Sequence, residues 1–94
     1  MIKISTNKMG NVYIKSSFLK DVIKSIIIQY INEKKIIDID FDIKRNSLKL
    51  INIKLIKENN WSREEQKNLI DDISFTLSSK YQITNKVITF MYEN

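Results

Sequence analysis

Residues 37–44 alternate strictly between apolar and charged side chains. The apolar residues are Ile37, Ile39, Phe41 and Ile43. The charged residues between and after them are Asp38, Asp40, Asp42 and Lys44. Successive side chains of a β-strand point to opposite faces, so a period of two indicates a strand with one buried face. The chain must therefore build a sheet that has an apolar side, with a cover over it, and a polar side.

A turn and a second strand are expected to follow this segment. Residues 45–47 predict a hairpin turn in which Asn46 takes the left-handed conformation. Residues 48–57 return as a strand, but their apolar positions change phase, and a β-bulge near Leu50 and Ile51 would reconcile the two phases. With this bulge, the expected cross-strand pairs are Asp42 with Lys49 and Asp38 with Lys54.

Two amphipathic helices are predicted, one on each side of the hairpin. Apolar residues recur at three- and four-residue spacing over 17–32, and serines at 16–17 offer an N-cap. A second stripe predicts a helix over 62–81. Ser62 and Glu65 form a capping box at its start.

Two further strands complete the expected fold. Residues 11–15 alternate after a turn at Gly10, and residues 85–92 are apolar on both faces, which indicates an interior strand or a partly covered edge. We predict a single α+β domain over residues 1–94, with the order β-α-β-β-α-β. Both helices pack on one face of a three- to four-stranded sheet, and the other face is left to solvent or to a partner. Residues 1–9 are expected to form a loose N-terminal extension.

The chain has neither histidine nor cysteine. This excludes Cys/His zinc sites, cysteine nucleophiles, Ser-His-Asp triads and disulfides. Asp38, Asp40 and Asp42 form a D-x-D-x-D run, but a calcium loop needs glycine where Ile43 stands and an acid where Lys49 stands. We expect no catalytic residue, no cofactor, no metal site and no enzymatic activity; a metal-dependent enzyme built on the three aspartates is the remaining alternative.

The charge balance has two interpretations. Sixteen basic residues stand against 11 acidic ones, a net charge of +5, and 14 of the 16 are lysines. Ile, Lys and Asn make up 43 of the 94 residues, and the coding bias of an AT-rich bacterial genome explains much of this excess without any nucleic-acid partner. The alternative is non-specific, salt-dependent binding to the phosphates of a nucleic acid. The residues expected to serve it are Lys15, Lys20, Lys24, Lys44, Arg45 and Lys49.

Sequence patterning also bears on location. The longest purely apolar run is residues 26–28, whereas a transmembrane helix needs about 20 apolar residues. Residues 1–10 contain lysines but lack the apolar centre of a secretory signal. We therefore expect a cytoplasmic protein that contacts a membrane, if at all, peripherally and through a partner.

Two large apolar residues fall outside the helical stripes. Ile28 lies off the stripe of the first predicted helix, and Phe75 lies off that of the second. Single exposed apolar residues are common on protein surfaces, but these two are also candidates for contact with a protein partner or with another copy of the chain.

The order and phase of the apolar positions allow one family comparison. The positions that carry it are Gly10, Val12 and Ile14 before the first helix, and Tyr81, Ile83, Val87 and Phe90 after the second. Over about residues 10–93 this pattern resembles the alkaline shock protein family of Gram-positive and related bacteria. The chain departs from that family at Asn46 and at residues 59–60, where glycines are usual.

The resemblance implies a small non-enzymatic protein linked to envelope stress or lipid metabolism, which in some members is held near the membrane by a separate anchor protein. We therefore expect an interaction or scaffold module that binds a protein partner or itself. The same topology occurs in ribosome-binding factor A, so a ribosome- or RNA-associated factor with a KH-like fold is the alternative.

Overall fold

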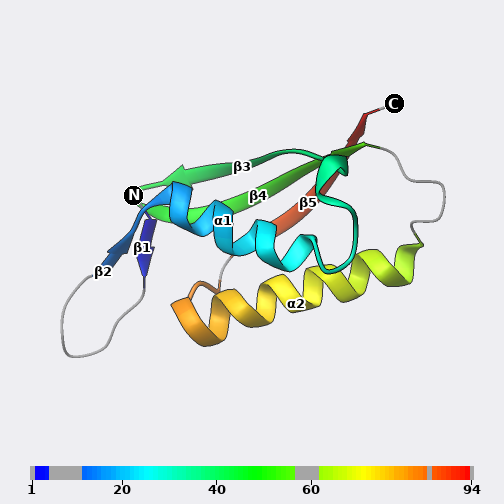
Figure 1. The fold of residues 1–94 in the computed structure, drawn as a ribbon. Coiled ribbons are helices and arrows are strands. Elements are labelled where there is room, and N and C mark those ends of the chain that lie inside the picture. The colour runs from blue at the N-terminus through cyan, green and yellow to red at the C-terminus, as the bar shows by residue number, and fades with distance from the viewer. Residues whose placement is uncertain (1, 5–11, 57–61, 85, 94) are drawn as a thin grey trace.

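The computed structural model describes residues 2–4, 12–56, 62–84 and 86–93 (Figure 1). Two α-helices, one 3-10 helix and five strands lie in these ranges. In chain order they are β1 (Ile2–Ile4), β2 (Val12–Ile14), α1 (Ser16–Ile27), η1 (Glu33–Lys35), β3 (Ile36–Lys44), β4 (Ser47–Ile56), α2 (Arg63–Tyr81) and β5 (Val87–Glu93). The predicted α+β class with two helices is confirmed.

The strands form two separate sheets. The main sheet has the order β3-β4-β5, in which β3 and β4 are antiparallel and β4 and β5 are parallel. The small sheet pairs β1 with β2, in a register that places Ile2 opposite Ile14. The predicted order therefore lacked one strand, and the first predicted strand belongs to the small sheet. Residues 2–4 are not a loose extension, because Ile2 is fully buried in the core; residues 5–9 lie outside the described residues.

The β3-β4 hairpin follows the prediction in its turn and differs by one residue in its bulge. Arg45 and Asn46 form the turn, both with positive φ, at 52° and 65°. The extra residue of β4 is Lys49, since Asp42 pairs with Leu50 and Ile43 pairs with Leu48.

This register decides the two predicted cross-strand pairs. The pairing of Asp38 with Lys54 is confirmed, whereas that of Asp42 with Lys49 is wrong. The reason is packing: with Lys49 as the extra residue, Leu48 and Ile51 both point into the core, where they are 4% and 0% exposed.

The two helices differ in how well their ends were predicted. Ser62 accepts a hydrogen bond from the Glu65 N–H over 3.1 Å and caps α2 as expected. By contrast, α1 ends at Ile27, five residues early, and Lys15 occupies its N-cap position without a side-chain hydrogen bond. Tyr30, beyond the end of α1, donates a hydrogen bond to the Asp72 carboxylate of α2, and this bond raises the pKa of Tyr30.

The core lies between the helices and one face of the main sheet (Figure 1). Its fully or nearly fully buried side chains come from both helices, from β4 and from the N-terminus: Leu19, Ile23, Ile27, Leu69, Ile73, Leu77, Ile51, Ile53, Leu55 and Ile2. Successive side chains of β4 alternate between the two faces, so the side chains that are not in the core lie on the face of the sheet opposite the helices.

Candidate functional site

The sheet face opposite the helices is the main candidate surface. Strand pairing arranges its side chains in rows that run across β3, β4 and β5: Asp42-Leu50-Val87, Asp40-Asn52-Thr89 and Asp38-Lys54-Met91, followed by Ile56-Glu93 on β4 and β5. We call these eleven residues the open sheet face. Within the described residues both helices lie on the other side of the sheet (Figure 1).

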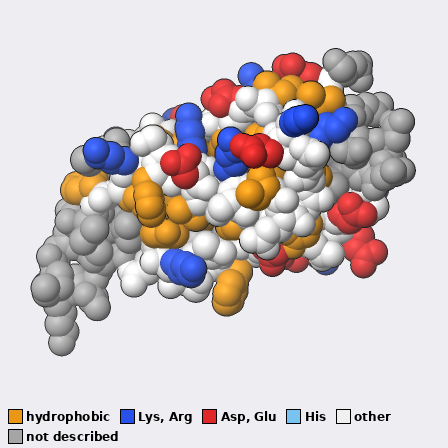
Figure 2. Space-filling view, in the orientation of Figure 1, with side chains coloured by type: hydrophobic (Ala, Val, Ile, Leu, Met, Phe, Trp, Pro, Cys, Tyr) orange, Lys and Arg blue, Asp and Glu red, His pale blue; other side chains and the backbone are white. Residues whose placement is uncertain are grey.

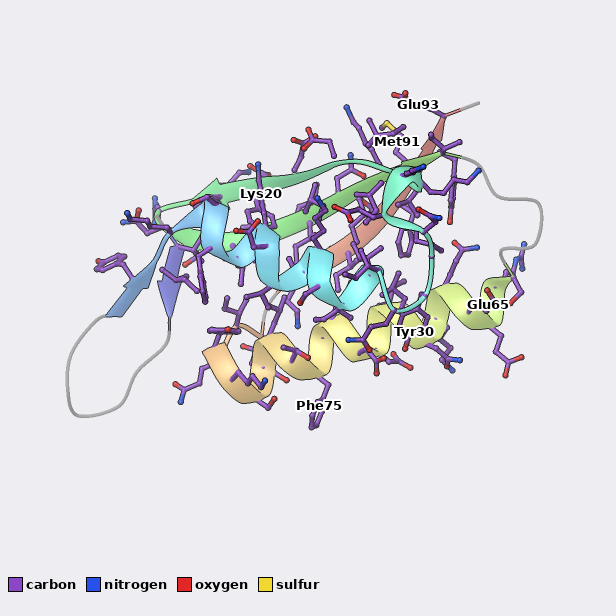
Figure 3. All side chains as sticks on the ribbon, viewed as in Figure 1. Lys20, Tyr30, Glu65, Phe75, Met91 and Glu93 are labelled. Carbon is purple, nitrogen blue, oxygen red and sulfur yellow. The ribbon has the colours of Figure 1, made fainter. Side chains whose placement is uncertain are left out.

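The open sheet face changes in character from one edge to the other. The β3 side carries three aspartates, and the β5 side carries exposed apolar side chains. Val87 is 58% exposed, Met91 is 48% exposed and the neighbouring Ile56 of β4 is 37% exposed. Figure 3 shows Met91 on the side of the sheet away from the helices. An acidic edge and an apolar edge thus lie on the same face of the sheet.

Polar contacts occupy the middle of this surface. The Thr89 hydroxyl lies 3.1 Å from Asn52 Oδ1 and donates a hydrogen bond to it. Lys54 Nζ lies 3.9 Å from Asp40 Oδ2, which is a loose ion pair across the strands. The ion pair partly neutralises the aspartate row, as the sequence predicted. Among the described ion pairs, Lys54 is the one lysine that pairs with these aspartates.

Asp38 is the aspartate whose ionisation the fold perturbs. The Ile39 N–H donates a hydrogen bond to Asp38 Oδ1 over 2.8 Å. This bond is the main cause that lowers the pKa of Asp38, and a hydrogen bond with Asp40 and the charges of Lys20 and Lys54 act in the same direction. The folded protein therefore favours the ionised form of Asp38.

Replacing Asp38 by asparagine is expected to remove a small, pH-dependent part of the stability. Because the pKa is lowered on folding, the wild-type carboxylate stabilises the fold above its unfolded pKa of about 3.9, and this contribution disappears as the pH falls through the lower folded value. Asparagine keeps an acceptor for the Ile39 N–H. Urea unfolding at pH 7 and near pH 2 should give a deficit for Asp38→Asn at pH 7 only. A deficit that is equal at both pH values would mean that the charge is not responsible.

The aspartate run does not assemble a metal site. In the described part of the chain, no group of three His, Cys, Asp or Glu side chains lies close enough to hold a metal ion. Adjacent positions on one face of a strand stand roughly 7 Å apart, and β4 supplies a lysine and an asparagine beside the aspartates rather than a further carboxylate. The geometry gives no support to the alternative of a metal-dependent enzyme at Asp38, Asp40 and Asp42.

The two apolar residues singled out from the sequence are exposed but belong to different surfaces. Ile28 is 46% exposed at the C-cap of α1, on the same side of that helix as Lys24, which lies beside β3. Phe75 is 72% exposed and points away from α2 on the side opposite the sheet (Figure 3). Neither belongs to the open sheet face.

The six candidate polyanion-binding residues divide into two groups. Lys15, Lys44, Arg45 and Lys49 lie near one end of the molecule, where α1 begins beside the hairpin turn (Figure 1). Lys20 and Lys24 instead lie along α1; Lys24 pairs with Glu33 over 2.9 Å, and Lys20 Nζ lies 5.8 Å from the centre of the Phe41 ring. Basic and acidic side chains are interspersed on the side that carries α1 (Figure 2).

A shallow depression lies between α1 and β3. It has a volume of about 170 Å³ and is lined by Lys20, Asp21, Lys24 and residues 36–39. Ligand pockets usually enclose about 300–1,000 Å³ and are largely apolar. This depression is small, and its lining includes two lysines and two aspartates, so it is a weaker candidate than the open sheet face.

Comparison with known proteins gives information about the fold alone. No family model matches the chain, and no curated protein matches it. A solved structure of CzrB, which is described as a zinc transporter, is similar with a TM-score of 0.51 and 13% identity, over 86% of this chain and 99% of that one. The resemblance to alkaline shock proteins stays a prediction. Of the helices described, neither has the length and hydropathy needed to span a bilayer.

Sequence reasoning missed the apolar part of the open sheet face. The signal was present, since residues 85–92 are apolar on both faces and were interpreted as an interior strand or a partly covered edge. The structure makes β5 an edge strand that pairs with β4 on one side. Ile88 and Phe90 are half-buried on the helix side, which leaves Val87 and Met91 on the open side.

Proposed function

We propose that this protein is a non-enzymatic interaction module that binds a protein partner through the open sheet face. The observation that carries the proposal is the apolar part of that face, formed by the exposed Ile56, Val87 and Met91 together with the half-buried Leu50. A sheet buries one face against its helices and normally leaves the other face polar unless something covers it. Exposed apolar side chains that share one face and are bordered by polar ones are typical of interaction sites.

Charge favours a particular kind of partner. The apolar half of the face is bordered on the β3 side by Asp38, Asp40 and Asp42, of which the first two contact basic or amide groups and Asp42 is exposed. A protein surface with an apolar centre and a basic rim matches this arrangement. Such complementarity directs the orientation and the rate of association more than the affinity.

The wider role follows from the resemblance and not from the fold. An alkaline-shock-like scaffold in the cytoplasm, linked to the envelope or to stress and reaching a membrane only through its partner, is the setting that we propose. The likeness to CzrB does not extend the proposal to zinc, because the chain lacks the imidazole and thiolate ligands that most zinc sites use.

Comparative affinity capture tests this function. Tagged wild-type protein and the double variant Val87→Lys, Met91→Lys would be recovered from native cells, and the membrane and ribosomal fractions would be analysed by mass spectrometry. Two lysines in an apolar contact should reduce recovery of the specific partner roughly tenfold or more. Both positions are exposed, so the fold should tolerate the change.

Phe75→Lys and Ile28→Lys are matched controls, because each also replaces an exposed apolar residue by lysine. We expect both to retain the partner. Loss of the partner with either control, and retention with the double variant, would move the binding surface to the helices. Identical recovery from all four proteins would overturn the proposal.

Binding to a polyanion is the second candidate function. One observation favours it: α1 has Lys15 at its N-cap and no acidic residue in its first turn, and it begins near the cationic hairpin turn. The positive end of the helix dipole and these side chains attract the same anions. The interspersed acidic residues in Figure 2 argue against strong binding.

Filter binding of a generic RNA decides between the two functions. If the second function holds, RNA should be retained at about 50 mM salt and released as the salt concentration rises, because phosphate contacts displace counterions. A Lys44→Gln, Arg45→Gln variant should then bind less RNA, while Lys67→Gln, on the exposed surface of α2, should behave like the wild type. No retention at low salt would dismiss this function.

A further inference from the structure

The apolar side chains of the open sheet face fall into two groups. Leu50 pairs with Val87 at one end of the face, and Ile56 stands one row from Met91 at the other end. A polar row that contains Thr89 separates the two groups. Val87 and Met91 are four residues apart in one strand, so the two groups lie about 13 Å apart. A partner must therefore supply two apolar contacts at this separation.

The aspartates of β3 form a line of negative charge along the other side of the same face. Asp38, Asp40 and Asp42 occupy alternate positions of the strand, so neighbouring carboxylates stand roughly 7 Å apart. Because β4 separates β3 from β5, this line lies about 10 Å from the apolar side chains of β5. Lys54 pairs loosely with Asp40, and none of the described ion pairs involves Asp38 or Asp42. The line can therefore attract basic groups of a partner.

A second copy of the chain is poorly matched to this face. Two copies stacked face to face about a twofold axis perpendicular to the strands would set one line of aspartates against the other. An axis parallel to the strands, with the two faces fully overlapping, would place β5 of one copy over β3 of the other and bury carboxylates against apolar side chains. Like charges repel, and burying an unpaired carboxylate is costly. The charge pattern therefore favours a different protein that carries basic residues.

Backbone hydrogen bonding favours a helix as the bound element. The side chains of the open sheet face stand between a ligand and the backbone of the sheet. An extended segment lying on them would leave its own N–H and C=O groups without backbone partners, whereas an α-helix satisfies these groups internally. The opposite face of the same sheet is already covered by α1 and α2 (Figure 1). A helix on the open side would complete a helix-sheet-helix arrangement of layers.

We propose that the open sheet face binds one amphipathic α-helix of a partner protein, with its apolar stripe along β5 and a basic flank over the aspartates of β3. This inference rests on the proposed function and specifies the form of the partner. A helix rises about 1.5 Å per residue, so apolar residues about seven or eight positions apart span about 11–12 Å and reach both apolar groups. Lysines or arginines one turn apart, at about 5–6 Å, match the spacing of the aspartates.

A designed peptide tests this class of partner. The probe is a fluorescent, alanine-rich peptide of about 18 residues, with leucines about seven positions apart on one stripe and lysines along one flank. Fluorescence anisotropy should show saturable binding to the wild-type protein. Because the protein itself has a net charge of +5, general electrostatic attraction cannot explain binding of a cationic peptide. A peptide with the same residues, reordered so that the leucines are scattered around the helix, should bind about tenfold more weakly or less.

Variants on the two sides of the face test the apolar and the charged contacts separately. The double variant Val87→Lys, Met91→Lys should weaken peptide binding about tenfold or more, whereas Phe75→Lys, on the helix side of the molecule, should leave it unchanged. The double variant Asp38→Lys, Asp42→Lys should also weaken binding, and it should bind a matched peptide with glutamates in place of the lysines better than the wild type does. If this charge reversal fails to change the preference between the two peptides, the basic flank is wrong.

The outcomes distinguish this inference from the proposed function. If the designed peptide does not bind, but partner capture from cells still depends on Val87 and Met91, the helix is rejected and the proposed function stands. If light scattering shows a wild-type dimer that Val87→Lys, Met91→Lys dissociates, a second copy occupies the face and the inference is overturned. If the peptide does not bind and partner capture is the same for every variant, both the inference and the proposed function are rejected.

Discussion

Replacing Ile53 by alanine is expected to destabilise the protein by about 3 kcal/mol, within the usual range of roughly 2–5 kcal/mol for buried isoleucine. Ile53 is 0% exposed and lies in the central strand, paired with Ile39 on one side and Phe90 on the other. Removing its side-chain carbons loses their burial and leaves a cavity that rigid strands on both sides cannot close. Urea unfolding should detect the loss, and the melting temperature should fall by roughly 15 °C.

Ile56→Ala is the matched control for this prediction. Ile56 belongs to the same strand but is 37% exposed on the open sheet face. The same change of side chain there should cost less than about 1 kcal/mol, because much of the removed surface already contacts water. Equal costs at the two positions would contradict the assignment of the helix-covered face as the core.

The second large effect is expected at the N-terminus. Ile2→Ala should cost about 3 kcal/mol as well, since Ile2 is 0% exposed and packs with the core from strand β1. A residue in a loose extension would tolerate the change with a loss of less than about 0.5 kcal/mol. Denaturant unfolding of the wild type and this variant distinguishes the two cases.

Ile28→Ala serves as the control, because it makes the same substitution at a position that is 46% exposed. It should cost clearly less than Ile2→Ala. If Ile2→Ala unfolds like the wild type, then strand β1 contributes little to the stability of the fold. Residues 2–4 would then behave as part of the loose N-terminal extension that the sequence predicts.

Local signals in the sequence were sufficient for the elements with strong periodicity. The alternation of residues 37–44 predicts β3, and the capping box at Ser62 predicts the start of α2 within one residue. The left-handed Asn46 of the hairpin turn was also predictable, since short polar side chains such as asparagine tolerate positive φ, whereas the positive φ of Arg45 was not predicted. These features depend on residues that are close in the chain.

Features set by distant contacts were not predictable. The end of α1 is one case: the apolar stripe continues to Tyr30 and Ile31, but these residues reach the core from turns after the helix has ended. β1 is another, because a three-residue strand has too few positions to show a period. The bulge at Lys49 depends on which of the two phases of apolar residues in β4 packs better against the helices. The sequence of β4 alone does not determine this.

The candidate surface divides in the same way. The aspartates of β3 were visible from the sequence, and so was the pairing of Asp38 with Lys54. The apolar half was not, because Val87 and Met91 become one surface with Leu50 and Ile56 through the parallel pairing of β5 with β4. Exposed Ile28 and Phe75 were easier to find, since a helical stripe shows directly which residues lie outside it.

By itself, the sequence determined that this chain forms an amphipathic α+β domain without histidine or cysteine chemistry, because composition and periodicity are properties of neighbouring residues. The tertiary structure decided that β5 is an edge, that its open side is apolar, and that Ile2 belongs to the core. Each of these depends on which strand lies next to which. The order of the strands brings together residues such as Leu50 and Val87, which lie far apart in the chain. No local sequence pattern predicts this order.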